Sequence, residues 1–192
     1  MTTTMVHVRI DQETKRRATK TLAAMGMSVS DAVRMLLIRV AAESTYALRA
    51  MGRNTEARRR LAQIRTMFYP DQGPESLTLT SSSPADALLQ AEADMDAATG
   101  NPRAAIETYR LLLRKYEERG YRPQESLTDA LALSTRQGRL MHICRQAGDP
   151  SAADAYAGER LALWRHWNQR LPDNSLIIRE LADAQDKLPG AH

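Results

Sequence analysis

The sequence contains one short segment with the alternation of a β-strand, and no second strand follows with which it could pair. One face of this segment carries Val6, Val8 and Ile10, and the other carries Met5, His7 and Arg9. A period of two with β-branched residues on one face is typical of a half-buried strand. Because a single strand is unstable by itself, we expect it to pair with the same strand of a second chain.

A helix is expected directly after this strand, over residues 11–25. Asp11 is placed to cap it, and Ala18, Leu22 and Met25 form one apolar stripe along it. Gly26 is suited to end the helix because glycine readily adopts the left-handed conformation of a C-cap.

A second helix is expected over residues 29–50. Ser28 and Asp31 form a variant of the capping box at its start. The helix is apolar on nearly every face, and a unit of about 45 residues is too small to bury it alone. We therefore expect an intertwined dimer, whose core would contain Val6, Val8, Ile10, Leu22, Val33, Leu36, Leu37 and Val40.

The order of strand, helix, tight turn and helix resembles the ribbon-helix-helix fold. Over residues 5 to about 44 the sequence resembles the RelB/DinJ type of bacterial antitoxin. The resemblance rests on a strand that ends in Arg-Ile-Asp, a first helix that ends in Leu-Ala-x-Met-Gly-Met, and a second helix that opens with Ser-x-Ser-Asp-x-Val-Arg.

This resemblance implies that a two-stranded ribbon from a dimer lies in the major groove of double-stranded DNA. Met5, His7 and Arg9 would then face the bases, and Arg9 is suited to a bidentate contact with guanine. The N-terminus of the second helix would hold a DNA phosphate with Ser28, Val29 and Ser30. Further phosphate contacts are expected from Lys15, Arg16 and Arg17, for which a merely solvated helix face is the alternative.

The charge distribution is consistent with a polyanionic partner for the first third of the chain. Residues 1–69 contain 13 Lys/Arg and 5 Asp/Glu, whereas residues 70–192 contain 14 and 18. The first part therefore has a charge of +8 and the rest −4. The alternative is a basic face that only contacts solvent.

The remainder of the chain departs from the antitoxin pattern, in which a short tail wraps a toxin. It carries a repeat with a spacing of 48 residues, marked by Gly52, Gly100 and Gly148 and, five positions later, by Ala57, Ala105 and Ala153. Each glycine is expected at the turn of a helical hairpin, and each alanine allows close helix packing. The motif Gly-Asn-Pro-x-Ala-Ala-Ile-x-x-Tyr resembles a tetratricopeptide (TPR) repeat, although the usual period is about 34 residues.

These patterns predict a mainly α protein with a ribbon-helix-helix module at 1–45 and a TPR-like repeat domain at 46–192. Further helices are expected at 54–68, 85–98, 102–119, 126–147, 150–170 and 174–187, with a loop at 69–83. We expect Trp164 and Trp167, which share a helix face, to pack in the core.

No enzyme, cofactor or metal site is predicted. Cys144 is the only cysteine, so neither a disulfide nor a zinc framework is expected, and cytoplasmic localisation without membrane insertion is favoured. Phosphate-binding and HExxH motifs are absent from the sequence. The acidic pairs Glu117–Glu118 and Asp94–Asp96 are expected on solvated helix faces.

Two interpretations remain open at this stage. In the first, the chain is a dimeric, sequence-specific DNA-binding regulator whose repeats bind a protein or peptide. In the second, it is a TPR-like adaptor or an antitoxin in which the N-terminal module mainly dimerises the chain. The acidic balance of residues 70–192 would suit a basic partner.

Overall fold

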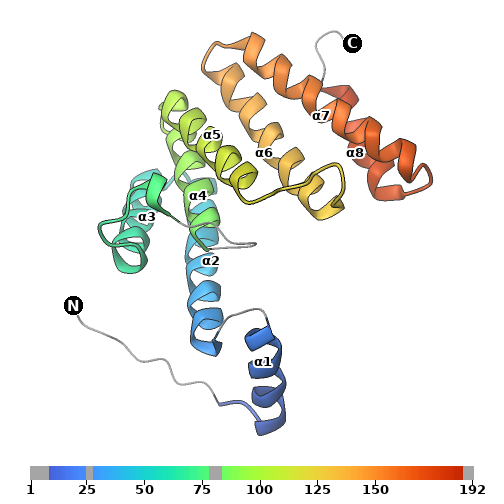
Figure 1. Ribbon diagram of the computed structural model, residues 1–192. Helices are drawn as coiled ribbons and strands as arrows, with labels where there is room; N and C mark the ends of the chain where they lie inside the picture. The colour runs from blue at the N-terminus through green and yellow to red at the C-terminus, as the bar shows by residue number, and fades with distance from the viewer. Residues whose placement is uncertain (1–8, 25–27, 78–83, 188–192) are drawn as a thin grey trace.

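The structure, a computed structural model, describes residues 9–24, 28–77 and 84–187. In these ranges it contains eight α-helices and no strand, which confirms the mainly α prediction (Figure 1). The helices are α1 (Gln12–Ala24), α2 (Val29–Ala50), α3 (Asn54–Phe68), α4 (Pro84–Ala98), α5 (Pro102–Glu118), α6 (Leu127–Gln146), α7 (Pro150–Arg170) and α8 (Ser175–Asp186). Every predicted helix is present, and each end lies within a residue of its predicted position.

At the start of several of these helices, a side-chain oxygen accepts a hydrogen bond from a backbone amide of the first turn. The amide of Thr14 donates a 2.8 Å hydrogen bond to Asp11 Oδ1, which confirms the predicted cap of α1. Hydrogen bonding from the side chain of Thr14, and then from its amide, favours the carboxylate and lowers the pKa of Asp11. Asp149 accepts in the same way from the amide of Ala152, at 3.0 Å, at the start of α7.

The glycine repeat corresponds to three helical hairpins, formed by α2 with α3, α4 with α5, and α6 with α7. The turn glycines Gly52, Gly100 and Gly148 have φ angles of 73°, 84° and 77°, which a side chain disfavours. The alanines Ala57, Ala105 and Ala153 are all 0% exposed. The 48-residue sequence repeat therefore corresponds to a structural repeat: each hairpin has a glycine turn with a positive φ and a fully buried alanine five residues later.

The hairpins stack side by side, and their cores share helices. One buried cluster joins α2, α3 and α4, a second extends from α4 to α7, and a third joins α6, α7 and α8. Trp164 and Trp167 are buried in the third cluster, as predicted. Their ring nitrogens donate hydrogen bonds of 2.8 Å to Ser134 Oγ and to the carbonyl oxygen of Pro123.

Helix α2 links the N-terminal segment to the stacked hairpins. It runs without a break across residue 45, where the boundary of the N-terminal module is predicted. Its Ile38 and Ala42 are each 2% exposed and lie in the cluster with α3 and α4. A continuous helix therefore connects the N-terminal segment to the hairpins.

The predicted loop at 69–83 contains a short 3₁₀ helix (Pro74–Ser76), and its residues 78–83 lie outside the described ranges. Among the helices that the structure describes, none has the length and apolar character to cross a membrane.

Candidate nucleic-acid interface

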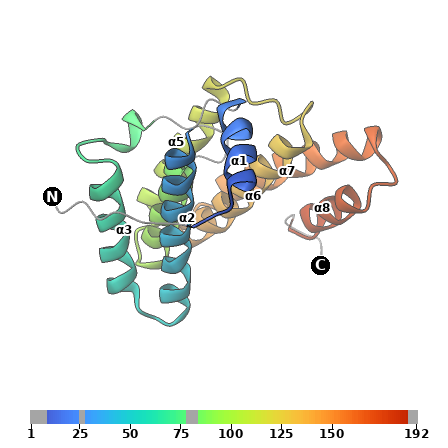
Figure 2. The same ribbon diagram turned by 90° about the horizontal axis from the view of Figure 1, so that it is seen from below.

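Helices α1 and α2 form the described part of the predicted DNA-binding module. Helix α1 lies beside the beginning of α2 at one end of the molecule, and α2 continues from there into the stack of hairpins (Figures 1 and 2). The predicted strand lies mostly outside the described residues, and so do four of its members, Met5, Val6, His7 and Val8. The base contacts assigned to Met5 and His7 therefore stay predictions.

Arg9 and Ile10 are the two residues of the predicted strand that the structure describes. Both are exposed and belong to neither a helix nor a strand. Ile10 is 49% exposed. The predicted pairing with a second chain would cover it.

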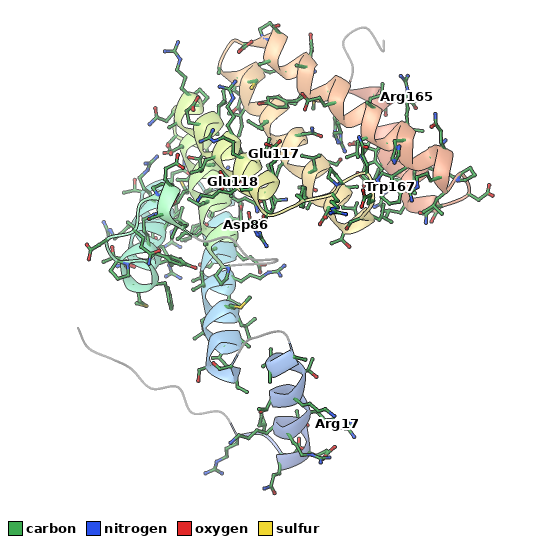
Figure 3. The ribbon with its side chains drawn as sticks, in the orientation of Figure 1. Arg17, Asp86, Glu117, Glu118, Arg165 and Trp167 are labelled. Carbon is green, nitrogen blue, oxygen red and sulfur yellow. The ribbon has the colours of Figure 1, made fainter. Side chains whose placement is uncertain are left out.

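The basic residues of α1 extend into solvent. Arg16 and Arg17 both bond to the carboxylate of Glu13, at 2.9 and 2.7 Å, and their side chains are 77% and 78% exposed. Lys15 is exposed as well. Figure 3 shows Arg17 on α1 at the end of the molecule opposite to Trp167. Since ion pairs this exposed are weak, Glu13 does not hold the two guanidinium groups against a competing phosphate.

The N-terminus of α2 presents its first turn to solvent. Ser28 and Ser30 are exposed and Val29 is half-buried. The first hydrogen bond of the helix runs from the amide of Ala32 to the carbonyl oxygen of Ser28, at 3.1 Å. Helix geometry leaves the amides of Val29 and Ser30 without an acceptor inside the helix, which is the arrangement that binds a phosphate.

An apolar face runs along the outside of α2. Leu36, Leu37 and Val40 are 59%, 44% and 54% exposed. Val33 is half-buried, as is Leu22 on α1. No other part of residues 9–24, 28–77 or 84–187 covers this outer face of α2, which we define by Leu36, Leu37 and Val40, all three of them predicted for the dimer core.

One prediction about the acidic residues is wrong. Asp94 does not lie on a solvated face but is only 4% exposed. Tyr109 Oη and Arg139 Nη1 each donate a 2.7 Å hydrogen bond to its carboxylate, and Arg49 Nη1 lies 4.0 Å away. Burial and the Asp94 charge raise the pKa of Tyr109, so its hydroxyl stays protonated and donates. Asp94 therefore joins α2, α4, α5 and α6 through one carboxylate.

The other three residues of the predicted acidic pairs lie closer to solvent than Asp94 does. Glu117 and Glu118 are exposed near the end of α5, as expected (Figure 3). Asp96 is half-buried and accepts a 3.1 Å hydrogen bond from Arg58. Within the described ranges, His, Cys, Asp and Glu side chains nowhere gather in threes as metal ligands do.

Comparison with known proteins supports the N-terminal assignment only. The family model of the RelB antitoxin matches residues 3–52, roughly a quarter of the chain, and this range includes all of α1 and α2. The match relates this segment to regulators of toxin–antitoxin systems, which are not enzymes. No curated protein and no solved structure matches the chain, and no family model supports the likeness of the hairpins to TPR repeats.

Proposed function

We propose that the protein is a homodimeric, sequence-specific DNA-binding regulator of the antitoxin type. Two copies of residues 5–10 would form a ribbon in the major groove of double-stranded DNA, with Met5, His7 and Arg9 toward the bases. The stacked hairpins would act as a TPR-like interaction domain.

The observation that carries this proposal is the outer face of α2. Three large aliphatic side chains, Leu36, Leu37 and Val40, stand exposed on a helix that lies inside the range matched by the RelB family model. Burial of a fully exposed aliphatic side chain contributes about 1.5–3 kcal/mol, and since these three are about half exposed, covering each would contribute roughly half of that. A second copy of α2 related by two-fold symmetry would cover all three, because such an interface brings the same patch of both chains together.

The positions of the polar groups support DNA as the ligand of the dimer. The first turn of α2, with Ser28 and Ser30 exposed and Val29 half-buried, presents backbone amides and the positive end of a helix dipole, which suit a phosphate. The exposed cations of α1, at Lys15 and Arg17, add positive charge on the neighbouring helix. Together they would fix the ribbon on the duplex while the strand residues read the sequence.

The test is fluorescence anisotropy of the purified full chain with DNA from upstream of its own gene and with scrambled DNA of equal length. The regulator proposal requires tighter binding to the upstream DNA. It also requires that log affinity falls linearly with log salt concentration, as it does when phosphates are neutralised. Equal, weak binding to both DNAs that moderate salt abolishes would contradict the proposal.

A second candidate function is that of a protein-interaction adaptor or toxin-neutralising antitoxin. It is favoured by the size of the hairpin domain, since α3 to α8 make up most of the described chain. In this case the N-terminal module mainly dimerises the protein, and Arg9→Ala would leave the main function intact. Co-purification of a toxin-like product of a neighbouring gene would favour it.

A further inference from the structure

A pocket of about 620 Å³ lies where α2, α4, α6, α7 and the residue after α8 meet. This volume is in the range of small-molecule sites. Its charged lining residues are Arg49, Asp94, Arg139, Arg160 and Lys187. Four cationic side chains thus line the pocket with one carboxylate.

The one carboxylate of the lining, that of Asp94, interacts with two arginines. Arg139 bonds to Asp94 Oδ2 at 2.7 Å, and Arg49 lies 4.0 Å from the same oxygen. Arg139 keeps 47% of its side chain exposed, so much of its guanidinium group is open to a ligand. On this side of the pocket, two positive charges therefore face one negative charge.

On the other side, acidic residues of α8 hold Arg160 and Lys187 in place. Arg160 Nη2 lies 2.7 Å from Asp183 and 3.4 Å from Glu180, and Lys187 Nζ lies 2.8 Å from Asp183. Arg160 is 6% exposed, and its Nε donates a 2.7 Å hydrogen bond to Ser134 Oγ. These contacts use Nε and Nη2 of Arg160 and fix the orientation of its guanidinium group. They do not involve Nη1.

Two buried guanidinium nitrogens on this lining have no partner among the described residues. They are Arg49 Nε and Arg160 Nη1. Native proteins rarely leave such buried donors unsatisfied, and the binding of an anion is one way in which they are satisfied. Oxygen atoms of a phosphate or a carboxylate are the acceptors that a guanidinium group binds most strongly.

We propose that this pocket binds a small molecule that carries at least two phosphate or carboxylate groups. The two sets of cations, Arg49 with Arg139 and Arg160 with Lys187, come from different helices and would each hold one anionic group. Small residues leave space between them, since Ala97, Ala98 and Gly138 also line the pocket. This site does not depend on DNA binding, so its test and that of the regulator proposal fail separately.

The experiment is isothermal titration calorimetry of the full chain at low ionic strength, with pyrophosphate and with citrate as probes. We expect saturable binding of at least one of them. Arg139→Gln, which removes a half-exposed charged donor, should weaken it about tenfold or more. Lys187→Gln provides a second test. Lys187 directly follows α8, and its ion pair with Asp183 is half-exposed, so the substitution should disturb the fold little. The matched control is Arg59→Gln, which changes an exposed arginine outside this pocket.

The outcomes separate the two sources of negative charge. Binding of pyrophosphate alone identifies a phosphate ligand, binding of citrate alone a carboxylate ligand, and binding of both a site for either group. The proposal is overturned if neither probe binds saturably, or if Arg59→Gln weakens binding as much as the pocket variants do. It is also overturned if an acidic peptide such as hexaglutamate binds while neither small anion does.

Discussion

Leu36 and Ile38 lie two residues apart on α2 and face opposite sides: Leu36 is 59% exposed and Ile38 is 2% exposed. Ile38 packs into the cluster with α3 and α4, so the inner side of the helix is already used within the chain. The outer face of α2 has no such partner among the residues that the structure describes. One side of the helix thus packs in the hairpin core, and the other side presents the exposed apolar surface to which we assign the proposed dimer contact.

Val40→Glu is expected to turn the dimer into a monomer. Val40 is 54% exposed in the single chain, so the substitution costs the fold of the hairpins little. In a dimer it would bury an unpaired carboxylate against apolar side chains, which is strongly unfavourable. Size-exclusion chromatography with light scattering should give twice the chain mass for the wild type and the chain mass for the variant.

The control for this substitution is Met67→Glu on α3, where the methionine is 71% exposed. It changes a similarly exposed apolar residue outside the outer face of α2 and should leave the dimer intact. A wild-type protein that is monomeric at all accessible concentrations would contradict the assignment of this face.

Asp94→Asn is expected to destabilise the hairpins. The substitution keeps the size of the side chain but leaves Arg139 and Arg49 without their shared negative charge. Because Arg139 is half-exposed and can regain water, we expect a loss of about 2 kcal/mol in the free energy of unfolding. Urea denaturation followed by circular dichroism measures it.

The neighbouring Asp96→Asn is the matched control, since Asp96 is half-buried and its partner Arg58 is half-exposed. Exposed ion pairs contribute about 0–1 kcal/mol, so this variant should unfold close to the wild type. If both substitutions lowered the free energy of unfolding equally, the stabilising role assigned to the buried Asp94 carboxylate would be contradicted.

Two glycines should respond to alanine in opposite directions. Gly100 has a φ of 84°, so Gly100→Ala places a side chain in the left-handed region and should cost about 1 kcal/mol. Gly138 lies inside α6, and a Cβ there meets no atom within 4 Å. Gly138→Ala should therefore stabilise the protein by about 0.5–1 kcal/mol. Thermal unfolding curves of both variants, recorded beside the wild type, test this: two shifts of the same sign would refute it.

Helix boundaries could be predicted well because this sequence marks them with residues that have few alternatives. Gly100 and Gly148 each end a helix, and Pro102 and Pro150 each begin the next, where a missing amide hydrogen costs nothing. The stacking of hairpins followed from the 48-residue repeat. These local signals do not depend on long-range contacts.

Asp94 could not be placed by the same means, because its partners lie far along the chain. Arg139 is 45 residues away and belongs to another hairpin. The one local signal in the sequence was that Asp94 has apolar neighbours, Ala91 three positions before it and Met95 directly after it. Both are 1% exposed in the structure. The pocket beside it was missed for the same reason: its cations come from four segments that only the fold brings together.

The most direct test of the proposed function compares wild type with Arg9→Ala in the anisotropy assay, on upstream and on scrambled DNA. Arg9 is exposed, so its loss should not disturb the fold. A bidentate contact with guanine contributes about 1–3 kcal/mol, and a dimer makes it twice. We predict that Arg9→Ala abolishes the preference for upstream DNA but retains weak, salt-dependent binding to both DNAs, whereas Arg59→Ala behaves as the wild type. An Arg9→Ala protein that still prefers the upstream DNA as strongly as the wild type would contradict the account.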